Sequence, residues 1–137
     1  MNAKNFLWKI RNLDREIDVK LETLHRMKER ALSITQNYDK DGAQSTGDPH
    51  KYDSIVELED YIDRKVDELA AAKQAVMETI DRIPDERQRS VLTSYYVNGN
   101  TWEQTAVTLG YSYQHIRRIY KKALKSVEVI LDEGRPD

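Results

Sequence analysis

Apolar residues recur every three or four positions along the first part of the chain. Because an α-helix has about 3.6 residues per turn, this spacing places them on one stripe of a long helix. The stripe consists of Phe6, Ile10, Leu13, Ile17, Leu21, Leu24, Met27, Ala31 and Ile34. The pattern stops near Tyr38, and residues 39–50 are rich in Gly, Asp, Ser and Pro, which predicts a loop.

A second stripe of the same period follows this loop. It consists of Ile55, Leu58, Ile62, Val66, Leu69, Val76, Ile80 and Ile83. Pro84 ends the pattern, because a proline disfavours the helical conformation of the residue before it. Two long helices joined by one loop pair most simply as an antiparallel hairpin that resembles a coiled coil.

A pair of helices alone buries little apolar surface. We therefore expect the stripes of residues 1–83 to pack also on the C-terminal part of the chain or on a second copy of it. The hairpin is thus a candidate element for forming a homo-oligomer. A hairpin that packs only on its own domain is the alternative.

The helices predicted beyond the proline are shorter. Residues 85–97 read as one helix, closed by Asn98 and Gly99 as a left-handed stop. Thr101 and Gln104 then have the spacing of a capping box, in which each side chain binds a free backbone N–H at the start of a helix.

The next turn and the last helix also carry local signals. Gly110 ends the short helix, and Ser112 caps a longer one. Tyr111 and Ile116 are spaced to pack on each other as a hydrophobic staple. A helix, a tight glycine turn and a capped second helix together are typical of a helix-turn-helix.

The last helix has two chemically different sides. At about 100° per residue, its apolar residues fall opposite Gln114. These residues are Ile116, Ile119, Ala123, Val127 and Ile130. Within about 60° of Gln114 lie the polar residues Arg117, Arg118, Lys121 and Lys125.

Charge is concentrated in the same region. The chain has a formal net charge of -2, yet residues 87–125 hold seven Lys and Arg against the single acid Glu103. An acidic body with one basic surface indicates an anionic polymer as partner, and double-stranded DNA fits best. A solvated basic helix face without a partner is the alternative.

The types of the basic and polar side chains suit DNA. Arg pairs with guanine and Gln with adenine, while Lys binds phosphates. For contacts to bases we expect Tyr113, Gln114, Arg117 and Arg118. For phosphates we expect Lys121, Lys122 and Lys125, with Arg87 and Arg89 at the flanking backbone.

Other functions lack support in the residues. The chain has no cysteine, its three histidines lie in separate segments, and nothing pairs a nucleophile with a base. We expect no enzyme activity, no cofactor and no metal. Without a long apolar run or the apolar core of a signal peptide, we expect a soluble cytoplasmic protein that does not enter a membrane.

Residues 83–127 resemble region 4 of bacterial sigma-70-type factors. The matching residues are Pro84, Glu86, Arg87, Thr101, Glu103, Ala106, Leu109, Gly110, Ser112, Ile116, Arg117, Ala123, Leu124 and Lys125. The resemblance implies a domain that reads the −35 promoter element and touches the flap of RNA polymerase. The chain departs from that pattern at Gln104, Thr105, Tyr113 and Gln114, so we expect a different sequence preference.

The whole layout is similar to small phage and prophage proteins of the ArpU/RinA-like type. The sequence thus predicts an all-α protein, with a helical hairpin over 1–83 and a sigma-region-4-like helix-turn-helix domain over 84–137. The resemblance implies a phage regulator of transcription in a bacterial host that contacts RNA polymerase. A small subunit of phage DNA packaging, or a sigma mimic that binds polymerase without DNA, are the alternatives.

Overall fold

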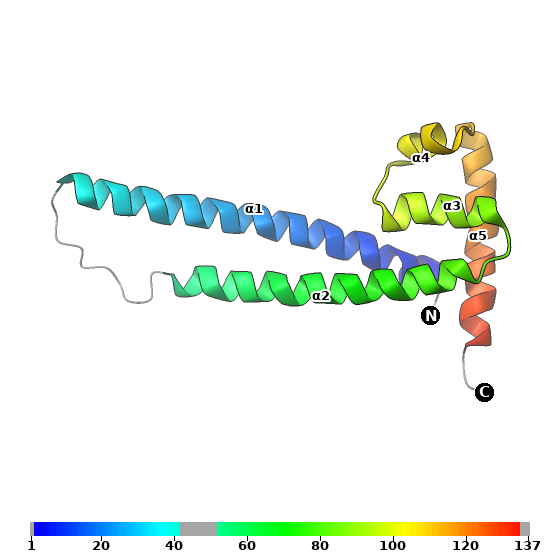
Figure 1. Ribbon diagram of the computed structural model, residues 1–137, viewed down its shortest axis with the longest axis horizontal. Coiled ribbons are helices and arrows are strands. Elements are labelled where there is room, and N and C mark those ends of the chain that lie inside the picture. Colours follow the sequence, from blue (N-terminus) through cyan, green and yellow to red (C-terminus); the bar gives the residue numbers. More distant parts are fainter. Residues whose placement is uncertain (1, 42–51, 135–137) are drawn as a thin grey trace. The chain divides into compact units, whose positions relative to one another are not determined.

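The protein is helical throughout the parts that the structure describes. In a computed structural model, the backbone is described for residues 2–41 and 52–134 and the side chains for residues 2–34 and 52–134. The elements are α1 (Ala3–Asp41), α2 (Asp53–Asp81), α3 (Glu86–Leu92), the π-helix η1 (Thr93–Val97), α4 (Trp102–Leu109) and α5 (Tyr113–Glu133). Figure 1 shows these helices, and no strand occurs in the described ranges. The predicted all-α class is confirmed.

Two compact units divide the chain. One contains Leu13–Glu68, and the other contains Met1–Asn12 together with Leu69–Asp137. The helices that follow Pro84 therefore belong to the same compact unit as the first residues of α1 and the last residues of α2. The division of the sequence into domains 1–83 and 84–137 stays a prediction.

Within the unit Leu13–Glu68, α1 and α2 run side by side in opposite directions (Figure 1). Leu24, Ile55 and Ile62 are buried between them, with Met27, Ala31 and Leu58 packed around these three. The Lys28 ammonium lies 3.3 Å from a Glu59 carboxylate oxygen and links the two helices. The predicted antiparallel hairpin is thus present in this unit.

Helix α1 is longer than its apolar stripe predicts. The loop was expected at 39–50, but the helix continues through Asp41. The reason is that Gly42 is the first residue after Tyr38 that strongly disfavours a helix. The rest of the expected loop, residues 42–50, lies outside the described residues.

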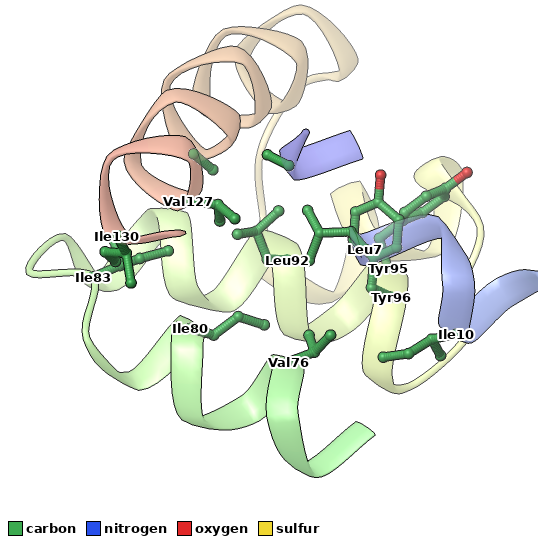
Figure 2. Close-up of a cluster of buried hydrophobic side chains, with 12 residues drawn as sticks. Leu7, Ile10, Val76, Ile80, Ile83, Leu92, Tyr95, Tyr96, Val127 and Ile130 are labelled. Carbon is green, nitrogen blue, oxygen red and sulfur yellow. The ribbon is translucent and has the colours of Figure 1, made fainter. Parts of the chain in front are cut away.

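The main core belongs to the other unit and joins four segments of the chain. The start of α1, the end of α2, the α3–η1 segment and the C-terminal half of α5 each contribute side chains (Figure 2). Its buried members are Ala3, Leu7, Ile10, Val76, Ile80, Ile83, Leu92, Tyr95, Tyr96, Ala123, Val127 and Ile130. Half of this core therefore comes from segments that precede Pro84.

A smaller core lies under the turn between α4 and α5. Val91, Ile116 and Ile119 are buried there, and the side chains of Ala106, Leu109 and Tyr111 pack on them. Together the two cores hold α5 along its apolar side. They also explain why the α4–α5 turn has a fixed geometry.

The helix expected over 85–97 is not a single α-helix. After Leu92 the chain continues as η1, in which the N–H of Asn98 donates to the carbonyl of Thr93 at 2.9 Å. This five-residue spacing coincides with three consecutive buried side chains, Ser94, Tyr95 and Tyr96. The capping and stop signals of the sequence mark helix ends and do not encode this wider turn.

None of the helices in the described ranges combines the length and the apolar character that crossing a membrane requires.

Candidate nucleic-acid interface

Local hydrogen bonds set the start of α4 as the sequence predicts. The N–H of Gln104 donates to Thr101 Oγ1 at 3.0 Å, and the N–H of Thr101 donates to Gln104 Oε1 at 2.9 Å. This reciprocal pair is a complete capping box and satisfies two backbone donors that the helix itself leaves without a partner. It therefore fixes the residue at which α4 begins.

The turn into α5 is equally well defined. Gly110 adopts φ 72°, a left-handed conformation that glycine takes without steric cost. Two residues later, Ser112 Oγ accepts the N–H of His115 at 3.1 Å and caps α5. Tyr111 and Ile116 pack in the same small core, as expected for a hydrophobic staple.

Helix α5 has the predicted apolar back. Each of the five residues expected there is buried, namely Ile116, Ile119, Ala123, Val127 and Ile130. Burial of about five such side chains stabilises the position of the helix by several kcal/mol. The opposite side of α5 is consequently held at the surface in a fixed orientation.

All seven side chains of α5 that the sequence predicts to contact DNA are exposed. They are Tyr113, Gln114, Arg117, Arg118, Lys121, Lys122 and Lys125. We call this set the basic front of α5. The Arg117 guanidinium lies 6.0 Å from the centre of the Tyr113 ring, which places these two side chains on the same flank.

The two arginines of α3 differ in their surroundings. Arg87 is exposed, and its Nε lies 3.9 Å from an Asp85 carboxylate oxygen. Arg89 is half-buried, and its Nη1 donates to the carbonyl oxygens of Ile83 at 2.6 Å and Pro84 at 2.9 Å. Arg89 thus closes the turn between α2 and α3, and its contact to DNA stays a prediction.

An open pocket of about 230 Å³ lies where the start of α3 meets α5. Four of the side chains around it are Arg87, His115, Arg118 and Lys122. The DNA-contacting residues predicted from the sequence do not include His115. Its position about 20° from Lys122 on the helical wheel could have indicated that it lies on the same side of α5. Proximity to Arg87 was not readable, because it depends on how α3 packs on α5.

Arg11 of α1 binds the backbone of η1 and of the segment between η1 and α4. Its Nη1 donates to the carbonyl oxygen of Tyr95 at 2.9 Å and to that of Asn100 at 3.4 Å. The guanidinium also lies 4.1 Å from the centre of the Tyr95 ring, on which Trp102 stacks at 3.7 Å. The N-terminal helix therefore fixes the segment that leads into α4.

A buried polar network joins η1 to α4. Ser94 Oγ and Thr105 Oγ1 are 2.9 Å apart, and both side chains are buried. Asn100 Nδ2 donates to Ser94 Oγ at 3.0 Å. Thr105 stands where the resemblance to sigma-type factors implies a branched apolar residue, and its hydroxyl is here used in this network.

Two tyrosines connect η1 with α5. The hydroxyl oxygens of Tyr96 and Tyr120 are 2.7 Å apart. Burial raises the pKa of both phenols, and for Tyr96 the hydrogen bond to Tyr120 raises its pKa further. Both side chains consequently remain neutral hydrogen-bonding groups through the neutral pH range.

Across the described parts of the chain, no group of three or more His, Cys, Asp or Glu side chains is placed to hold a metal ion.

Comparisons with known proteins agree with this geometry. Residues 85–128 match the family described as sigma-70, region 4. The RNA polymerase sigma factor SigO of Bacillus subtilis (strain 168) is 37% identical over 72 residues, which cover 51% of this chain and 40% of that protein. The chain therefore spans less than half the length of this relative. No solved structure matches the chain.

The match covers α3, η1, α4 and residues 113–128 of α5, including the basic front. It ends at residue 128 and leaves out α1 and α2, although both contribute to the main core. The chain thus carries a sigma-70 region 4-like helix-turn-helix, formed by residues 85–128.

Proposed function

We propose that the protein is a sequence-specific DNA-binding regulator of transcription. In this proposal α5 enters the major groove with its basic front toward the DNA. The observation that carries it is the basic front itself, seven exposed side chains opposite a buried apolar back, within a segment that matches sigma-70 region 4. An ordinary solvated helix face mixes acidic and basic side chains, whereas these seven side chains include five basic ones and no acid.

The front divides into two chemical roles along the helix. Residues at the start of a recognition helix approach base edges, so Tyr113, Gln114, Arg117 and Arg118 are the proposed base contacts. Arg donates two parallel hydrogen bonds to guanine, and Gln pairs in the same way with adenine. Lys121, Lys122 and Lys125 follow along α5 and are the proposed phosphate contacts, with Arg87 and Arg89 at the flanking backbone.

The experiment compares the native protein with the Arg117→Ala/Arg118→Ala double variant. Duplexes selected from a random pool and an unselected duplex are both titrated at several salt concentrations. Each arginine removed from the interface should cost about 1–3 kcal/mol on the selected duplex. Equal affinities of the two proteins at every salt concentration would exclude these residues from the interface.

Contact with bacterial RNA polymerase is the second part of the proposal. Its support is the family of the matched segment together with the relative, which is an RNA polymerase sigma factor. Polymerase should be retained by the immobilised protein both before and after the double substitution. A sigma mimic that does not touch DNA would retain polymerase, yet fail to shift a duplex even at low salt.

We also propose that the hairpin of unit Leu13–Glu68 forms a homo-oligomer. One flank is polar, because the Tyr61 hydroxyl donates to Glu16 and the Lys20 ammonium lies 5.5 Å from the Tyr61 ring centre. At about 100° per residue the opposite flank holds four exposed apolar side chains. They are Leu21, Leu32, Val56 and Val66, each between 45% and 58% exposed.

The mass of the protein in solution tests this assembly. A dimer or other small oligomer that dissociates after Leu21→Lys would support it, whereas a native monomer at high concentration would contradict it. Rings of about eight or more copies would instead favour the packaging alternative, because DNA-packaging subunits assemble in this way.

The origin of the protein is the remaining part of the proposal. The hairpin followed by a sigma-like segment supports a phage or prophage regulator that acts in the bacterial cytoplasm. Transcripts of late phage genes should change when the gene is deleted from a lysogen before induction. Unchanged transcripts at all phage promoters would contradict this role.

A further inference from the structure

The pocket between α3 and α5 brings three cations together from separate parts of the chain. Arg87 comes from α3, and Arg118 and Lys122 come from successive turns of α5. The one carboxylate at the pocket, Asp85, already accepts the backbone N–H groups of Arg87 at 2.8 Å and Gln88 at 3.4 Å. The pocket therefore has an excess of positive charge and donors for an anion.

The walls of the pocket are held in place without a ligand. Ser126 Oγ of α5 donates to Gln88 Oε1 of α3 at 2.6 Å, which ties the two helices together at this edge. Ile119, whose side chain is buried in the smaller core, forms part of the lining. A pocket that is already formed loses little conformational entropy when an anion enters.

His115 adds an imidazole to the cations at the pocket. Its ring packs edge-on against Tyr111 at 4.7 Å between ring centres, and its side chain lines the pocket. The charged groups that face it are Asp85 and Arg87 from the α3 side and Arg118 and Lys122 from α5. An anion in the pocket would add an attractive charge beside the imidazole, where the cations Arg87, Arg118 and Lys122 otherwise outnumber the one carboxylate, Asp85.

We propose that this pocket binds one phosphate of the DNA backbone and that His115 makes this binding depend on pH. The inference rests on the proposed DNA binding and deepens it. It assigns Arg118 to the backbone rather than to a base, which narrows the base-reading set to Tyr113, Gln114 and Arg117. His115, which the sequence-based assignment left out, becomes a phosphate contact.

The test measures the affinity for an unselected 20-bp duplex by fluorescence anisotropy at constant ionic strength, between pH 5.5 and 8.5. Native protein should bind about five to ten times more tightly at pH 5.5 than at pH 8, because a histidine normally gains its proton near pH 6.5. His115→Gln should remove most of this increase. His115→Arg should bind tightly across the whole range.

His25→Gln is the matched control. His25 is an exposed residue of α1, which lies far from the basic front in the sequence. Its Nε2 lies 3.0 Å from a Glu29 carboxylate oxygen. The pH dependence of this variant should equal that of the native protein. Far-UV circular dichroism at pH 5.5 and 8.5 confirms that each variant keeps its helices.

The outcomes separate the two proposals. If native protein binds no duplex at any pH, the proposed DNA binding is wrong. If it binds but its affinity is independent of pH, or if His115→Gln keeps the native dependence, the pocket does not work as proposed.

Arg118→Ala provides a second readout on the same protein. It should weaken binding to a selected and to an unselected duplex by the same factor, about threefold to tenfold, because phosphates carry no sequence information. Arg117→Ala should instead reduce the preference for the selected duplex. A change in preference after Arg118→Ala comparable to that after Arg117→Ala would overturn the assignment of Arg118 to the backbone.

Discussion

Individual side chains in this protein act through partners that are distant in sequence. Arg11 donates to carbonyl oxygens at Tyr95 and Asn100, and Tyr96 pairs with Tyr120 across the main core. These contacts connect the surface helix α5 and the segment leading into α4 to residues that bind no DNA in our proposal. The position of the basic front therefore depends on buried hydrogen bonds as well as on apolar packing.

The tyrosine pair predicts how stability changes with pH. Burial raises the pKa of Tyr96 in the folded protein, whereas an unfolded tyrosine ionises near pH 10. The stabilisation that the neutral phenol gives to the folded protein is thus complete below about pH 10 and is lost as the pH rises above that value. The free energy of unfolding should fall between pH 9 and 11 and fall less steeply for Tyr96→Phe.

Tyr113→Phe is the control for this measurement, because Tyr113 is 52% exposed. Denaturant unfolding of the three proteins at each pH gives the comparison. A decline that is equally steep for the native protein and Tyr96→Phe would show that another group is responsible.

At the scale of elements, the helix ends could be predicted well and the contacts between helices could not. The capping box at Thr101, the stop at Gly110 and the cap at Ser112 follow from backbone chemistry within four residues. The π-helix η1, which coincides with the buried Tyr95 and Tyr96, was missed because capping and stop signals mark only helix ends. The pocket around His115 was missed because it needs α3 beside α5.

The α4–α5 turn gives a prediction at this scale. Gly110 has φ 72°, and a Cβ added there would meet no atom within 4 Å. Gly110→Ala should therefore destabilise the protein by about 1–2 kcal/mol through backbone strain alone. Gly110→Asn should cost less, because asparagine tolerates the left-handed conformation better.

Gly134→Ala serves as the matched control, because Gly134 has an ordinary φ of -79° at the end of α5. Thermal melting of the three variants gives the order of stabilities. If Gly110→Ala were as stable as Gly134→Ala, the left-handed turn would not be present as described.

For the whole molecule, the segment that matches sigma-70 region 4 contains the smaller core but only part of the main core. Leu7 and Ile10 of α1 and Val76 and Ile80 of α2 pack with Leu92 and Val127. The apolar stripes predicted that α1 and α2 are helices, but periodicity alone did not say which ends of the stripes pack on α5. That information lies in the tertiary contacts of the unit.

Leu7→Ala tests this shared core. Leu7 is fully buried, so its truncation should cost about 2–5 kcal/mol. Leu21→Ala removes the same atoms from a side chain that is 46% exposed and should cost much less. Chemical denaturation measures both values, and similar costs for the two variants would contradict the role of α1 in the core.

The central claim is that the basic front of α5 binds DNA phosphates and bases. The most direct measurement is the salt dependence of affinity for an unselected duplex, because each phosphate contact lowers the slope of log affinity against log salt by about 0.9. Lys121→Gln/Lys125→Gln should reduce the magnitude of the slope by nearly two. Arg26→Gln/Lys28→Gln removes the same charge from exposed positions of α1 and should leave the slope unchanged. Equal slopes for the two double variants would contradict the claim.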